Sequence, residues 1–69
     1  MLVKVWRLVD GYKVTVYLSG NLSDEYRVKN LKVNSGFYNM KVDVRYFDGV
    51  KEAMFDAAED TFYIYTTLR

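Results

Sequence analysis

The chain has 69 residues, a net charge of +1, no cysteine and no histidine. These absences exclude disulfide bonds, thiol chemistry, the usual zinc sites and histidine acid–base chemistry, and we expect no metal, no cofactor, no catalytic residue and no enzymatic activity. A hydrophobic content of 51% and an aromatic content of 17% predict one folded domain over residues 1–69.

The first predicted element is a β-hairpin from Leu2 to Ser19, with Asp10-Gly11 at its tip. Asp-Gly between apolar runs favours a type I′ turn, which needs positive φ at both central residues. That turn pairs Val9 with Tyr12. The core face then contains Val3, Val5, Val9, Tyr12, Val14, Val16 and Leu18, and the opposite face contains Leu2, Lys4, Trp6, Leu8, Lys13, Thr15, Tyr17 and Ser19.

A second hairpin is predicted after a loop at residues 19–25. Its first strand begins near Tyr26, its second strand covers residues 37–47, and the turn between them is at residues 34–36. The register places apolar residues opposite apolar residues and Arg27 opposite Asp43, which favours the pairing. Lys29 falls opposite Lys41, a mildly destabilising pair of like charges.

Residues 50–59 are predicted to form a short helix. The residues Val50, Ala53, Met54, Ala57 and Ala58 have the i, i+3, i+4, i+7, i+8 spacing of an amphipathic helix, and alanine favours helices over strands. The alternative is a third hairpin at Asp48-Gly49, which makes residues 50–56 a strand. The last strand is predicted over residues 61–68, with Phe62, Ile64 and Leu68 on one side and Tyr63 and Tyr65 on the other.

The predicted fold class is α+β, mainly β, in the order β-β-β-β-α-β. It is an antiparallel five-stranded sheet or small open barrel with one short helix, and the alternative is an all-β six-stranded meander. A helix of about ten residues is only about 15 Å long, so it cannot cover both faces of such a sheet. This geometry predicts an exposed apolar face.

The first candidate site is a protein-binding surface. Tryptophan and tyrosine are enriched in interface hot spots, and the residues concerned are Leu2, Trp6, Leu8, Tyr17, Tyr63 and Tyr65. The alternative interpretation is structural: the helix covers the first four residues, and the last two are ordinary strand residues facing solvent.

The second candidate site is a nucleic-acid-binding surface on the predicted second hairpin. Basic residues beside tyrosines can hold single strands, because phosphates meet the cations and bases stack on the rings. The residues concerned are Arg27, Lys29, Lys32, Lys41 and Arg45. The alternative interpretation is a solvated face on which Glu25 and Asp43 neutralise part of this charge.

The leading functional hypothesis is a small, non-enzymatic, cytoplasmic regulatory protein that binds a protein partner or a second copy of itself. Size and composition are typical of proteins encoded by viruses and mobile elements. One alternative is a small-barrel nucleic-acid-binding protein, and another is a structural subunit of a larger assembly. No stretch reaches the length of a membrane span, so a membrane is not an expected partner.

Overall fold

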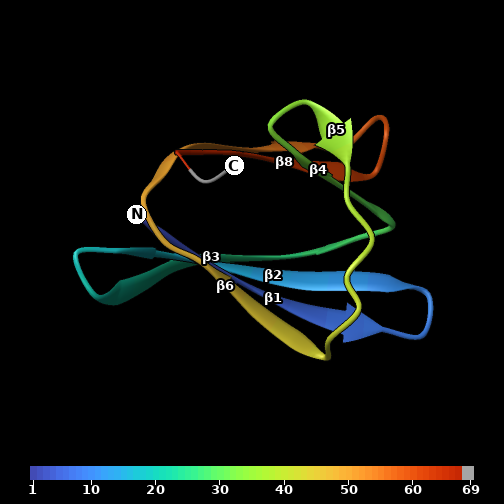
Figure 1. Ribbon diagram of the computed structural model, residues 1–69, viewed down its shortest axis with the longest axis horizontal. Helices are drawn as coiled ribbons and strands as arrows, with labels where there is room; N and C mark the ends of the chain where they lie inside the picture. Colours follow the sequence, from blue (N-terminus) through green and yellow to red (C-terminus); the bar gives the residue numbers. More distant parts are fainter. Residues whose placement is uncertain (68–69) are drawn as a thin grey trace.

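The computed structural model describes residues 1–67, which form eight strands and no helix (Figure 1). The strands are β1 (Leu2–Leu8), β2 (Gly11–Leu18), β3 (Asn21–Val28), β4 (Asn30–Val33), β5 (Gly36–Phe37), β6 (Val44–Phe47), β7 (Val50–Asp56) and β8 (Thr61–Thr66). They make two four-stranded sheets. The first sheet has the order β3-β2-β1-β6 and the second has the order β5-β4-β8-β7.

The two sheets face each other, and the chain crosses between them at three places (Figure 1). Lys29 alone separates β3 from β4, Asp48-Gly49 separates β6 from β7, and the segment 38–43 leads from β5 back to β6. The Val50 amide donates to the Met1 carbonyl at 3.1 Å, and the Met1 ammonium donates to the Val50 carbonyl at 3.2 Å. These two bonds join the start of β1 to the start of β7, so the sheets meet at this corner.

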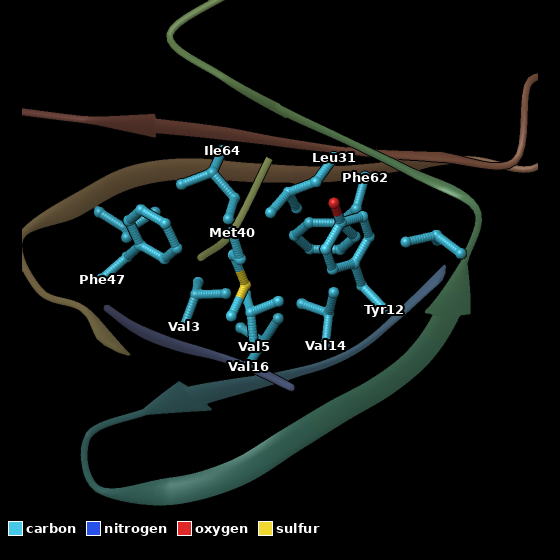
Figure 2. Close-up of a cluster of buried hydrophobic side chains, with 12 residues drawn as sticks. Val3, Val5, Tyr12, Val14, Val16, Leu31, Met40, Phe47, Phe62 and Ile64 are labelled. Carbon is cyan, nitrogen blue, oxygen red and sulfur yellow. The ribbon is translucent and has the colours of Figure 1, made fainter. Parts of the chain in front are cut away.

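The hydrophobic core fills the space between the sheets (Figure 2). In β1 and β2, alternate residues point inward, as the period of two in a β-strand requires. The core consists of Val3, Val5, Tyr12, Val14, Val16, Val28, Leu31, Met40, Phe47, Val50, Phe62 and Ile64. Met40 comes from the segment 38–43, so this connection also closes part of the core.

The first hairpin forms, but its predicted register is wrong by two residues. Val9 and Asp10 form the turn, Leu8 pairs with Gly11 and Val5 pairs with Val14. A shift of two residues keeps every side chain on its face, so five of the seven predicted core residues are buried. Val9 and Leu18, the other two, are exposed. Gly11 lies in the strand because β3 passes very close to it: a Cβ on Gly11 would clash with the carbonyl oxygen of Val28.

The predicted second hairpin is wrong except for a turn near residues 34–36, and that turn is one residue shorter than expected, because Gly36 pairs with Val33. Only Lys32 and Val33 of β4 pair with β5, in an antiparallel arrangement around the turn at residues 34 and 35. Residues 21–28, predicted to be mostly loop, form β3 and pair with β2, while β6 pairs with β1. The expected Lys29–Lys41 and Arg27–Asp43 pairs are therefore absent from the strand pairing of residues 1–67.

The helix predicted over residues 50–59 is a strand followed by a turn. A bulge between Val50 and Glu52 puts Val50 and Ala53 on the same face of β7, although they are three residues apart. This bulge produces the i, i+3 spacing that resembles a helix. The Asp56 carboxylate accepts a hydrogen bond from the Glu59 amide at 3.2 Å and stabilises the turn after the strand.

The predicted α+β class is therefore wrong, because the described chain is entirely β and divided between two sheets. The alternative, a six-stranded meander with residues 50–56 as a strand, is right about that strand, because β7 is Val50–Asp56. It is wrong about the connections: β6 and β7 belong to different sheets, and β4 and β8 pair in parallel, about thirty residues apart. β8 ends at Thr66, and Leu68, expected on the inner side of this strand, lies outside the described residues.

Candidate functional site

The outer face of the first sheet carries aromatic and basic side chains in register across its four strands. Paired residues point to the same side of a sheet. Because Val3 and Val5 of β1 point into the core, the residues that alternate with them, Leu2, Lys4 and Trp6, point outward. One row across the sheet contains Val44, Trp6, Lys13 and Arg27, the next contains Tyr46, Lys4, Thr15 and Glu25, and a third contains Leu2, Tyr17 and Leu22.

Trp6 lies between two lysines on this face. The ammonium nitrogens of Lys4 and Lys13 are 4.6 Å and 4.3 Å from the centre of its ring system, and Lys4 is also 5.1 Å from the ring centre of Tyr46. These distances are within the range of cation–π attraction. Tyr46 is 55% exposed, and Trp6 is half-buried with the two lysine side chains over it, so access of a ligand to the indole depends on movement of these lysines.

The cations on this face are available to an anion. Residues 1–67 contain one ion pair, between Arg7 and Asp43 at 3.6 Å. Lys4, Lys13 and Arg27 form no ion pair within these residues. Glu25 is the one carboxylate in the three rows described above. We define the basic aromatic face as Trp6, Tyr46, Lys4, Lys13 and Arg27; it carries a local excess of positive charge.

The other sheet carries a local excess of negative charge. The β7–β8 hairpin carries Glu52, Asp56, Glu59 and Asp60 against the single cation Lys51. Glu59 accepts a hydrogen bond from the Tyr63 hydroxyl at 3.2 Å. The two sheets therefore differ in charge, and an anionic ligand is attracted to the first sheet.

The protein-binding residues expected from the sequence are divided between the two sheets. Leu2, Trp6, Leu8 and Tyr17 belong to β1 and β2 and are half-buried. Their surroundings are more basic than the sequence interpretation assumed, because Lys4 and Lys13 lie over the indole.

Tyr63 and Tyr65 lie on the outer side of the second sheet and do not extend the surface around Trp6. The Tyr65 hydroxyl is hydrogen-bonded to the Ser35 hydroxyl at 2.7 Å.

The nucleic-acid-binding residues expected from the sequence do not form one cluster. Arg27 lies on the basic aromatic face. Lys29 is the exposed residue that links β3 to β4, and Lys41 lies in the connection 38–43. Lys32 lies on the second sheet, with its ammonium 4.5 Å from the ring centre of Phe37. Arg45 donates a hydrogen bond to the Tyr38 hydroxyl at 2.7 Å.

Sequence reasoning assigned Lys4 and Lys13 to the outer face of the first hairpin but did not treat them as binding residues. The available signal was the spacing of Lys4 and Trp6, which are two residues apart in β1 and therefore point to the same face. Tyr46 could not be found in the same way, because its place beside Lys4 depends on the pairing of β6 with β1, about forty residues apart.

Neither metal binding nor membrane spanning is indicated by the described part of the chain. Residues 1–67 contain no group of three or more acidic, histidine or cysteine side chains that could hold a metal ion. No helix in the same residues is long and apolar enough to cross a membrane.

The fold and the outer face define a small all-β domain of two sheets, one of which presents an accessible basic and aromatic surface. The chain matches no protein-family model, no curated protein and no solved structure. Its function is therefore inferred from this geometry.

Proposed function

We propose that the protein binds single-stranded nucleic acid on the basic aromatic face. The observation that supports this most directly is the position of Lys4 and Lys13, with both ammonium groups less than 5 Å from the Trp6 ring centre on an accessible sheet face. Proteins that bind single strands combine cations that contact the phosphates with aromatic rings on which the bases stack. This face offers both kinds of group within two neighbouring rows.

The bases would stack on Trp6 and Tyr46, and the phosphates would contact the cations beside them. Lys4 and Lys13 have long flexible side chains, so their ammonium groups can turn from the rings towards phosphate oxygens without moving the strands. Arg27 extends the positive charge to the far edge of the sheet. Because every base has an aromatic surface, binding through stacking is expected to depend little on sequence.

The leading hypothesis from sequence, protein binding through an apolar patch, is less well supported by this geometry. The cores of protein interfaces are depleted in lysine, whereas two lysines lie over the tryptophan at the centre of this face. A structural role in a larger assembly has no specific observation in its favour. A cytoplasmic location, where single-stranded RNA is available, forms part of the same proposal and can be checked by cell fractionation.

Fluorescence of Trp6 tests the proposal directly, since it is the only tryptophan of the chain. We expect a ten-nucleotide oligothymidylate to quench this fluorescence. With three phosphate contacts, from Lys4, Lys13 and Arg27, log K should fall against log salt with a slope of about −2, which is a loss of roughly 20-fold between 50 mM and 200 mM salt.

A duplex of the same length is the control ligand, because its bases are not available for stacking. Absence of oligothymidylate binding at 50 mM salt would refute the proposal. In that case, light scattering of the protein and of Trp6→Ala would show whether this face serves self-association.

A further inference from the structure

A cavity of about 300 Å³ lies where the start of β2, the β3–β4 junction and the start of the segment 38–43 meet. Figure 2 shows Tyr12, which lines this cavity, at one end of the core. Its hydroxyl lies 3.3 Å from both the Tyr38 carbonyl and the Asn39 amide oxygen, which can each accept its hydrogen. This volume is at the lower end of the range of small-molecule sites, about 300 to 1,000 Å³.

The side chains around the cavity offer three kinds of interaction. Phe37 contributes an aromatic ring that is 76% exposed. Lys29 contributes an ammonium group outside the ion pair found in residues 1–67. Asn30 and Asn39 contribute amides with both donors and acceptors. Because the amide oxygen of Asn39 faces the Tyr12 hydroxyl, its NH₂ group is the part left for a ligand.

We propose that this cavity binds one nucleotide. The base would stack on Phe37, its polar edge would bond to Asn30 and Asn39, and its phosphate would contact Lys29. The choice of a nucleotide as ligand rests on the proposed function, because the same chain already presents groups suited to bases and phosphates on the first sheet. An apolar ligand fits less well, since cationic and amide side chains make up much of the lining.

The cavity is also connected to the basic aromatic face along the chain. Arg27 on that face is two residues before Lys29, and a smaller neighbouring cavity of about 190 Å³ is lined by both. Asp10 and Asp60 also line this smaller cavity and would repel a phosphate. The phosphate is therefore expected beside Lys29 in the larger cavity. A single strand bound across the first sheet could therefore continue past Arg27 and place an unstacked base in the larger cavity.

Titrations of the isotope-labelled protein with AMP, GMP, CMP and UMP, followed by NMR, test the inference. We expect the amide signals of residues 29–31 and 37–39 to shift, with different affinities for different bases because the asparagine amides contact the base edge. Phe37→Ala should weaken binding by roughly 5- to 100-fold, the range expected for the loss of one stacked base. Lys29→Ala should weaken binding and remove most of its salt dependence.

Matched substitutions outside the cavity serve as controls. Val42→Ala removes an exposed apolar side chain as Phe37→Ala does, and Lys41→Ala removes an exposed lysine as Lys29→Ala does. Both controls should bind nucleotides like the parent protein. If Phe37→Ala binds as well as Val42→Ala, or if no nucleotide shifts the signals of the cavity, the inference is wrong.

The outcomes also separate this inference from the proposed function. If oligothymidylate quenches Trp6 but no nucleotide shifts the signals of the cavity, the cavity inference fails and the proposed function stands. If nucleotides shift the cavity signals but no oligonucleotide binds the first sheet at 50 mM salt, the cavity inference stands and the proposed function fails. If neither ligand binds, both are refuted.

Discussion

At the residue scale, Trp6 is the most informative side chain because it belongs to the surface and not to the core. Core residues of the same strand, Val3 and Val5, are fully buried, whereas the indole lies outside them beneath two lysine side chains. Its contribution to folding is therefore limited to packing against the sheet and to cation–π attraction, which is worth about 0.5 to 1 kcal/mol per contact at an exposed site. Under the proposed function, the indole contributes more to ligand binding than to stability.

Trp6→Ala separates binding from folding. We expect it to weaken oligothymidylate binding by roughly tenfold or more, through the loss of a stacking surface. It should lower the free energy of unfolding by about 1 to 2 kcal/mol, mainly through the loss of its two cation–π contacts. Ile64→Ala, at a fully buried position, should cost about 2 to 5 kcal/mol. Binding is measured by the anisotropy of a labelled oligonucleotide and stability by urea unfolding. A loss of stability for Trp6→Ala as large as that for Ile64→Ala would assign the indole to the core.

Lys13→Ala tests the electrostatic part of the site. Removal of one phosphate contact should change the slope of log K against log salt from about −2 to about −1.4. Lys51→Ala is the matched control, because Lys51 is exposed on the acidic β7–β8 hairpin. An equal effect of the two substitutions would mean that the slope reflects net charge and not contacts on the first sheet.

At the element scale, local pattern predicted the faces of the strands better than their partners. The alternation of valines predicted the inner face of β1 and β2, because a strand's period of two survives an error of two residues in register. The turn itself was misplaced, since Asp10-Gly11 resembles a type I′ turn in sequence while Gly11 is needed elsewhere. Gly11 has a φ of 154°, and the Val28 carbonyl of β3 occupies the space that a Cβ at this position would need. The local sequence does not reveal this approach of β3.

Gly11→Ala should therefore be among the more damaging single substitutions in the chain. An added Cβ would clash with backbone and not with a flexible side chain, so β3 must move away from β2. We expect a loss of about 3 kcal/mol, against a total stability of roughly 3 to 10 kcal/mol for a chain of this length.

Gly20→Ala is the comparison, because Gly20 has a positive φ of 81° but no atom near the position of a Cβ. It should lose only about 1 kcal/mol from backbone strain. Urea unfolding of the two variants gives the ratio directly, and equal losses would show that φ, and not the approach of β3, determines the need for glycine at position 11.

At the scale of the whole molecule, several features that sequence reasoning missed depend on pairing between distant segments. β1 pairs with β6 and β4 pairs with β8, across about forty and thirty residues. Such contacts are determined by the overall arrangement of the two sheets and leave little trace in a local pattern. The basic aromatic face was missed in part for this reason, since β6 brings Tyr46 beside Lys4. The acidic character of the β7–β8 hairpin, by contrast, can be read directly from the letters of residues 52–60.

The separation of charge between the two sheets has a consequence that depends on ionic strength. The molecule extends 29 × 25 × 24 Å, and sheets in a sandwich are about 10 Å apart. A ligand on the outer side of the first sheet is therefore well over 10 Å from Glu52 on β7. The Debye length is about 30 Å at 10 mM salt and about 8 Å at 150 mM, so the hairpin influences the ligand only at low salt.

Glu52→Lys should accordingly tighten oligothymidylate binding by roughly two- to fivefold at 10 mM salt and leave it unchanged at 150 mM. Glu52→Gln, which removes the charge without reversing it, should give a smaller effect of the same kind. Anisotropy titrations at the two salt concentrations provide the measurement. A gain in affinity that persisted at 150 mM would place the ligand within a few ångströms of β7, on the second sheet, and would move the binding surface from Trp6 to the side of the molecule that carries Tyr63.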